Sequence, residues 1–275
     1  MSKKAVYAVL IALLLPLLAY FLLKGFSDRS VAMPRYYIYD TVITKTKSGK
    51  QYSDTIWHQL PDFSFTNQEG RKVSWKDIGE KVVVADFFFT HCPTICPALT
   101  RNMKELQDGI SNAQKVGSTD PTFIQFLSFS IDPERDSVAQ LKKWADRFQV
   151  NSDRWWLLTG DKKEIYDYSN KEMKLIAVDG EHVDSNFIHT DIFVLIDKHR
   201  NIRGYYHTLN PDFTPDTISL SKLSRDIILL SLEKDPTRKN GPFAGKLELL
   251  AVVFLITIIA VGLFFYFFKK QSSTT

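Results

Sequence analysis

Two uninterrupted apolar segments, one near each terminus, limit what this chain can fold into. Residues 5–23 and residues 249–268 contain no charged side chain. At a rise of 1.5 Å per residue each would form a helix of about 30 Å, close to the hydrocarbon thickness of a bilayer. We therefore expect two transmembrane helices, with the roughly 220 residues between them folding outside the bilayer.

The first apolar segment has an alternative interpretation as a cleaved signal peptide, because Lys3 and Lys4 form a positive region ahead of it. The run is long, however, and no small-residue cleavage site follows Leu23, which favours an uncleaved anchor. Lysines also flank the second segment, so the positive-inside rule would place both termini in the cytoplasm. Basic residues on the inner flanks weaken this signal and leave the topology open.

The composition is that of an ordinary globular protein, with 44% hydrophobic and 24% charged residues and a formal net charge of +4. Basic residues are spread along the chain, which does not favour nucleic-acid binding. The two cysteines cannot form a disulfide framework, so a packed core must stabilise the fold.

Strand-like and helix-like segments alternate between the two apolar ends. Residues 82–89 are apolar except for Asp86, as expected of a central strand covered on both faces. This alternation favours an α/β fold with a central sheet and helices on both sides. Residues 28–55 are polar and are expected to be a linker or an extended edge segment. Further strands are expected over 61–65 and 71–74 (a hairpin), 123–131, 156–158, 192–196 and 202–207, and helices over 75–80, 98–111, 137–148, 161–173 and 216–232.

The only two cysteines, Cys92 and Cys96, follow the central strand in the run HCPTICP at residues 91–97. Pro97 suits the first turn of a helix, because the N–H that proline lacks is unpaired there anyway. Cys96 then lies at a helix N-terminus, whose partial positive charge favours thiolate over thiol. Such a pair can cycle between dithiol and disulfide, or hold a soft metal ion such as Cu(I).

Two sulfurs alone leave a low coordination number, so we expect a third ligand, an imidazole, from elsewhere in the fold. Zinc would need four ligands. His189 directly precedes the apolar strand 192–196, at a point that sheet topology can bring beside the thiols, although an ordinary role for it stays open. His91 adjoins Cys92 on a tight loop, where its ring is expected to point away. Ordinary surface roles are expected for the remaining histidines, His58, His182, His199 and His207.

Acidic residues near the thiol motif have mostly local interpretations. A carboxylate at Asp86, inside an apolar strand, must be partnered or protonated, and it has a second interpretation as a buried acid assisting the thiols. Among Asp132, Glu134 and Asp136, we expect Asp136 to cap a helix and Arg135 to pair locally, rather than the three carboxylates binding a hard cation.

Three sequence blocks together carry a family resemblance. The run FFTHCPTICP at 88–97 resembles the signature of the Sco/SenC family of cytochrome oxidase copper chaperones. The run SIDPERD at 130–136 resembles the family's second hallmark, and His189-Thr190 ahead of an apolar strand resembles the third. The resemblance covers about residues 56–232, and the order of the three blocks is specific.

The resemblance implies a thioredoxin-like fold, a central mixed sheet flanked by helices. It implies that Cys92, Cys96 and His189 bind copper, and that the protein delivers copper to the Cu(A) site of cytochrome c oxidase subunit II. It also implies a membrane-tethered domain outside the cytoplasm, with a thiol reductase and a copper donor as further partners. Lys3-Lys4 leaves no room for a transit peptide, which favours a bacterial inner membrane with the domain on the periplasmic side.

The expected organisation is an N-terminal anchor at 1–27, a linker at 28–55, the Sco domain at 56–235, and a linker with the second transmembrane helix at 236–275. Thr94 and Ile188 stand where family members often carry acidic residues, which puts the tuning of the metal site in doubt. A second, C-terminal span also departs from the usual layout.

The main alternative is a thiol–disulfide oxidoreductase without metal, in which Cys92 attacks and Cys96 resolves. Oxidoreductases of this fold usually space their cysteines by two and carry a proline before a late strand, where this chain has Ile188-His189. A peroxidase would fit Thr90 loosely, but a second cysteine so close argues against it. The sequence thus favours a metallochaperone over an enzyme.

Overall fold

The structure is a computed structural model, and it describes residues 33–47, 50–115, 123–175 and 191–233. Met33–Glu233 forms one compact unit. Both apolar segments predicted to span a membrane, and also His182, Ile188 and His189, lie outside the described residues. No helix in the described ranges combines the length and the apolar character that a bilayer crossing requires.

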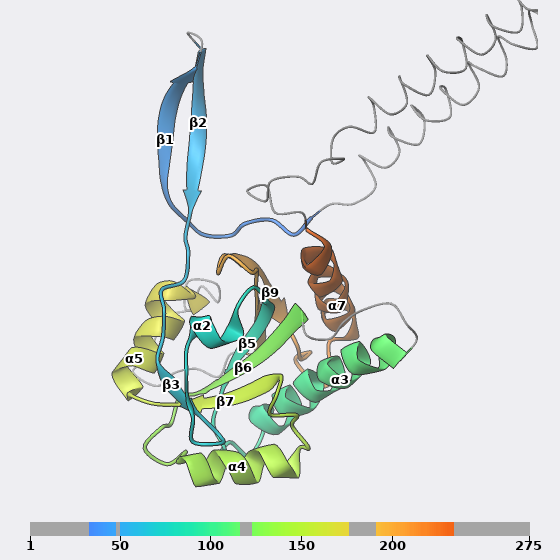
Figure 1. The fold of residues 1–275 in the computed structure, drawn as a ribbon. Coiled ribbons are helices and arrows are strands. Elements are labelled where there is room, and N and C mark those ends of the chain that lie inside the picture. Colours follow the sequence, from blue (N-terminus) through green and yellow to red (C-terminus); the bar gives the residue numbers. More distant parts are fainter. Residues whose placement is uncertain (1–32, 48–49, 116–122, 176–190, 234–275) are drawn as a thin grey trace, which may run out of the picture. The chain divides into compact units, whose positions relative to one another are not determined.

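A seven-stranded mixed sheet forms the centre of this unit (Figure 1). Its central strand β5 (Val82–Phe88) pairs in parallel with β6 and antiparallel with β8, and all of its residues are buried, as the apolar run predicts. The strand order across the sheet is β4 (Lys72–Val73), β3 (Phe65–Asn67), β7 (Trp155–Thr159), β6 (Ile124–Ser130), β5, β8 (Ile192–Ile196) and β9 (Ile202–His207).

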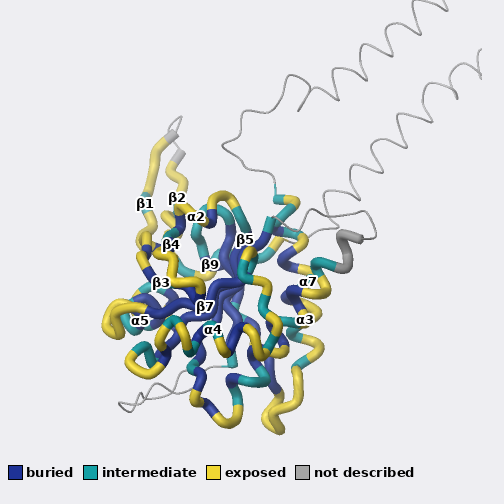
Figure 2. Tube along the Cα trace, turned by 60° about the horizontal axis from the view of Figure 1, so that its bottom comes forward, coloured by how far each residue is buried: buried dark blue, intermediate teal, exposed yellow. Residues whose placement is uncertain are grey.

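Helices cover both faces of the sheet, because alternate side chains of the strands point to opposite sides. On one face, α3 (Ile95–Lys115), α4 (Val138–Arg147) and α7 (Thr217–Leu232) share an apolar cluster with Val84 and Phe88 of β5. On the other face, α2 (Trp75–Ile78) and α5 (Lys162–Asp167) pack with Val83, Ala85 and Phe87. Figure 2 shows the buried strands between these layers. The expected α/β fold with a central mixed sheet is confirmed.

Several element boundaries differ from the expected ones. Helix α3 starts at Ile95, three residues earlier than expected, so it includes Cys96. The expected helix to residue 173 is α5 followed by a π-helical turn, η2 (Tyr168–Glu172). The hairpin near residue 70 is confirmed, with Phe65 of β3 opposite Val73 of β4.

The segment expected to be a linker or an extended edge segment, residues 28–55, holds most of a second sheet. Strands β1 (Tyr39–Lys47) and β2 (Lys50–Trp57) form an antiparallel hairpin that is separate from the main sheet and stands away from it (Figure 1). The threonine, valine and isoleucine residues of β1 favour an extended backbone. The polar residues between them hid this preference, because the segment lacks a continuous apolar run.

Candidate thiol and metal site

The two cysteines lie where β5 hands over to α3. Both thiols are free, and the residues are 4% and 1% exposed. The backbone N–H of Cys96 donates to the Cys92 sulfur at 3.4 Å, and the Thr94 hydroxyl lies 3.9 Å from the same sulfur. Pro93 and Thr94, between the cysteines, are exposed. The structure therefore brings the two sulfur-bearing residues together just below the surface, as their spacing predicts.

The surroundings of the two thiols shift their pKa values in opposite directions. Burial alone would raise the pKa of Cys92, but hydrogen bonds to its sulfur from the Cys96 and Thr94 backbone N–H groups, and from their side chains, together hold that pKa below its ordinary value. Burial raises the pKa of Cys96, and the nearby Cys92 and Asp86 charges raise it further. Cys92 is therefore the thiol that ionises first.

A fully buried carboxylate, Asp136, holds the loop that precedes Cys92. The Thr90 backbone N–H donates to it at 3.0 Å and the Thr90 hydroxyl at 2.5 Å, while the Ser130 hydroxyl donates at 2.6 Å. The expected helix-capping role for Asp136 is wrong, because the α4 cap is Ser137, whose hydroxyl accepts from the Gln140 N–H. The expected local pairing of Arg135 is confirmed by its ion pair with Asp132.

Sequence reasoning missed this role of Asp136, although a signal was present. Strands β5 and β6 are parallel and Phe88 lies opposite Ser130, so the residues that follow both strands meet at one end of the sheet. Polar residues after neighbouring parallel strands, such as Thr90 and Asp136, are therefore candidates for contact.

The ring of His91 contacts its own loop. Its Nδ1 lies 3.2 Å from the Thr90 hydroxyl and 3.6 Å from the Asp136 carboxylate, and the side chain is 44% exposed. Elsewhere, His58 lies between Asp40 and Glu172. In the part of the chain that the structure describes, no three or more His, Cys, Asp or Glu side chains are grouped so as to hold a metal ion.

The antiparallel pairing of β8 with β5 determines where the third sequence block enters the sheet. Val83 lies opposite Ile196 and Ala85 opposite Val194, so β8 begins at the end of the sheet where β5 finishes. We call this the thiol end of the sheet. Asp191, just before β8, is fixed there because its backbone carbonyl accepts from the Thr208 N–H at 2.9 Å. His189 comes two positions earlier in the sequence.

Asp86 lies on the thiol side of the sheet. Every second residue of a strand points to the same face, so Asp86 shares its face of β5 with Val84 and Phe88. The side chains of Val84 and Phe88 belong to one apolar cluster with both cysteines. The Asp86 carboxylate accepts a hydrogen bond from the Ser128 hydroxyl, but burial dominates and raises the pKa of Asp86 to about 7. The carboxyl is thus partnered, and its charge influences Cys96.

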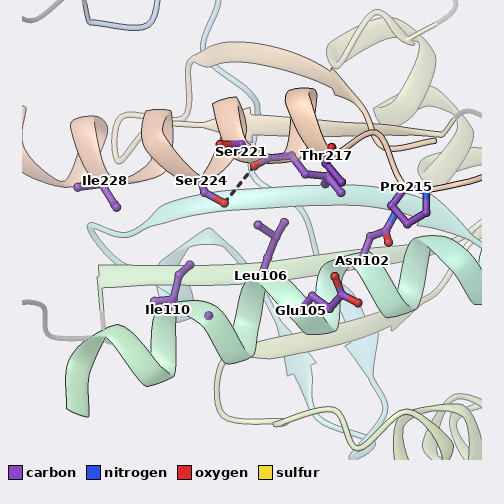
Figure 3. A pocket seen from close by; sticks show the side chains of 11 residues that line it. Asn102, Glu105, Leu106, Ile110, Pro215, Thr217, Ser221, Ser224 and Ile228 are labelled. Atoms are coloured by element: carbon purple, nitrogen blue, oxygen red, sulfur yellow. Dashed lines mark hydrogen bonds between the residues drawn. The ribbon is translucent and has the colours of Figure 1, made fainter. Parts of the chain in front are cut away.

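A groove of about 430 Å³ lies between α3 and α7 (Figure 3). Leu106 and Ile110 of α3 line one wall, and Leu220 and Ile228 of α7 line the other. Neither cysteine lines it, so this cavity is separate from the thiols.

Comparisons with known proteins agree on one family. The family model for SCO1/SenC matches residues 56–219. The SCO1 protein homolog of Bacillus subtilis (strain 168) is 34% identical over 180 residues, which cover 64% of this chain and 89% of that protein.

Two solved structures give the same result. A SCO1/SenC family lipoprotein from Bacillus anthracis is similar at 32% identity and a TM-score of 0.52, over 64% of this chain and 95% of its own. BsSco, a member of the Sco family of cytochrome c oxidase assembly proteins with a disulfide switch, is similar at 28% identity and a TM-score of 0.51. The match covers 65% of this chain and 96% of BsSco. Yeast Sco1, solved with copper bound, is a more distant likeness, with 21% identity and a TM-score of 0.49. The match covers 66% of this chain and 98% of the yeast chain.

Proposed function

Because the chain belongs to the SCO1/SenC family, we propose that it is a membrane-anchored copper metallochaperone for the Cu(A) site of cytochrome c oxidase subunit II. One observation carries the proposal: two adjacent, free and buried cysteines at the start of α3 in a chain of this family. Two soft sulfur donors suit Cu(I). A relative at 28% identity belongs to the cytochrome c oxidase assembly proteins, which supports an oxidase as the partner.

The proposed ligands are Cys92, Cys96 and His189. The antiparallel register of β5 and β8 supports the third, because the chain enters β8 at the thiol end of the sheet. Cysteine binds copper as thiolate, so loading requires the reduced dithiol and releases protons. Hydrogen bonds at its sulfur lower the pKa of Cys92, which makes that residue the first donor to become available.

The proposed location is a bacterial inner membrane, with the domain on the periplasmic side. Support comes from the uncharged segments 5–23 and 249–268, each long enough to cross a bilayer. The relative from Bacillus anthracis is a lipoprotein, so membrane attachment occurs in the family. We assign the anchors to 1–27 and to 236–275 and the Sco domain to 56–235.

The test is copper reconstitution of the reduced full chain in detergent, with stoichiometry and absorption spectrum. We expect one copper per chain, lost in each of Cys92→Ser, Cys96→Ser and His189→Ala. His199→Ala, on the β8–β9 turn at the opposite end of the sheet, is the matched histidine control and should bind copper as the wild type does. Full copper affinity in His189→Ala would contradict the proposed ligand set.

A second candidate function is thiol–disulfide exchange. It is favoured by the pKa values of the two thiols, which are shifted in opposite directions. Cys92, with the lowered pKa, suits attack on a partner disulfide, and Cys96, with the raised pKa, suits resolution. Resolution would release the partner's dithiol and leave a Cys92–Cys96 disulfide. His189→Ala separates the two functions, because it should abolish copper binding and leave disulfide-reductase turnover intact.

A further inference from the structure

Exposed apolar side chains are concentrated in one short stretch of the described unit. Residues 33–57 hold seven of the eleven large hydrophobic residues that are exposed in the described ranges. Concentrations of this kind mark surfaces that meet another molecule or a membrane. The seven are Met33, Tyr37, Tyr39, Val42, Tyr52, Ile56 and Trp57.

Most of these residues belong to the hairpin of β1 and β2, which pairs with no other strand among the described residues. Figure 2 shows that most of the described part of both strands is exposed. A two-stranded hairpin is at best marginally stable alone in water, and this one extends for about 30 Å. Val42 is 51% exposed and Tyr52 44%, so side chains on both of its faces are exposed. The exposure of the hairpin therefore indicates that another molecule or a membrane covers it.

The hairpin starts from a rigid base. Just before β1, the Tyr37 N–H donates to the Ile202 carbonyl at the start of β9, at 3.2 Å. The rings of Tyr36 and Trp57 stack at 4.9 Å, and the His58 N–H donates to the Ile38 carbonyl at 3.0 Å. The hairpin is therefore attached to the body at β9 and is not a loose loop.

This base lies at the end of the sheet opposite the thiols. Ile202 pairs with Ile196 at the end of β8, and Ile196 is next to Val83 at the start of β5. The seven residues of β5 separate the two ends by about 20 Å. The hairpin and the cysteines are thus at opposite ends of one sheet.

Both ends of the described chain leave from the same place. The buried guanidinium of Arg203, in β9, donates to the Pro34 carbonyl at 2.6 and 3.0 Å and to the Glu233 carboxylate at 2.6 and 2.9 Å. Pro34 precedes the hairpin by five residues, and Glu233 follows α7. The chains that lead to the two apolar segments therefore depart beside the base of the hairpin.

We propose that the β1–β2 hairpin lies on an anionic membrane surface and so turns the thiol end of the sheet away from the bilayer. The inference rests on the membrane anchoring in the proposed function. We propose lipid as the binding partner of the hairpin, because its exposed aromatic residues are tyrosine and tryptophan, which favour the membrane–water interface. The charge is complementary, since residues 33–57 contain four basic and two acidic residues: Arg35, Lys45, Lys47 and Lys50 against Asp40 and Asp54.

The test places an environment-sensitive fluorophore on single cysteines in a Cys92→Ser/Cys96→Ser background of the full chain. Val42→Cys and Tyr52→Cys report on the hairpin. Lys163→Cys, an 82% exposed side chain that follows β7 at the thiol end, is the matched control. The protein is reconstituted into vesicles of phosphatidylcholine with phosphatidylglycerol, and into phosphatidylcholine alone, with brominated lipid as the quencher.

Val42 and Tyr52 lie on opposite faces of the hairpin, so we expect quenching at whichever of the two faces the lipid to exceed that at Lys163 several-fold in the anionic vesicles. It should fall in phosphatidylcholine alone. Adding Lys47→Gln and Lys50→Gln should weaken hairpin association by about fivefold for each lysine removed. Hairpin labels shielded from a water-soluble quencher but not quenched by lipid would overturn the proposal and indicate contact with a second copy of the chain.

A label at Leu255→Cys, inside the second apolar segment, separates this proposal from the anchoring on which it rests. Lipid quenching at Leu255 with none at Val42 and Tyr52 would overturn the hairpin proposal alone and leave the anchor standing. No lipid quenching at Leu255 would overturn both.

Discussion

The hydroxyl of Thr90 donates to the carboxylate of Asp136 at 2.5 Å, across 46 positions of sequence. The same carboxylate accepts from the Thr90 backbone N–H at 3.0 Å, so the loop before Cys92 is tied to the segment after β6. Two sequence blocks that mark the family thus form one hydrogen-bonded unit around a buried carboxyl group. The position of Cys92 depends on this link as well as on helix α3, which begins three residues after it.

Replacing Asp136 with alanine should destabilise the protein by about 3 kcal/mol or more, because three donors from Thr90 and Ser130 would lose their buried acceptor. The free energy of unfolding from a urea titration measures this. Glu134→Ala, on the same loop with a 71% exposed side chain, should change it by less than about 0.5 kcal/mol. Equal effects of the two changes would contradict the positioning role of Asp136.

Cys92 should be alkylated before Cys96, by at least about tenfold in rate near neutral pH. The reason is that hydrogen bonds lower the pKa of Cys92 while burial raises the pKa of Cys96. Peptide mapping after a short iodoacetamide pulse measures the order. Thr94→Val removes one donor to the Cys92 sulfur and should slow its alkylation modestly. Faster labelling of Cys96 would refute the assignment.

The buried Asp86 should make the protein less stable as pH rises from about 4 to about 7. Burial raises its folded-state pKa to about 7, above the ordinary value of 3.8, so in this range the folded protein holds a proton that the unfolded chain releases. Above pH 7 the full loss in the free energy of unfolding is reached, on the order of 4 kcal/mol.

Asp86→Asn keeps an oxygen acceptor for Ser128 and removes the titration. Melting temperatures at pH 5 and pH 8 should therefore differ less in this variant than in the wild type. Asp212→Asn, in an exposed loop where hydrogen bonds from Thr214 lower the pKa, is the control and should leave that difference unchanged. An unchanged difference in Asp86→Asn would exclude Asp86 as its source.

Arg203→Met should destabilise the protein by about 3–5 kcal/mol, because it leaves the buried Asp197 carboxylate without its cation. It would also release Pro34 and Glu233 from the guanidinium. Chemical unfolding measures the loss, with Arg135→Met, a 62% exposed arginine, as the control. A loss no larger than that of the control would mean that Arg203 does not hold the chain ends.

Local patterns predicted much of this fold. The apolar run 82–89 became the central strand, and the thiol motif was correctly placed at a strand-to-helix junction with Pro97 in the first helical turn. These features depend on neighbouring residues, whose periodicity and backbone preferences can be read directly. The hairpin of β1 and β2 escaped notice because its strands bury little, so they lack the apolar run that identifies a core strand.

The sequence by itself determined the order of the elements that follow the β1–β2 hairpin, the pairing of two thiols at a helix start and the family to which the chain belongs. Only the tertiary structure decided that Asp136 would hold Thr90, that β8 would begin beside the thiol loop, and that Arg203 would join both chain ends. The physical reason is that these contacts link residues far apart in the chain. Their partners are selected by which strands pair and in which register, and the pattern of one segment taken alone does not give that pairing.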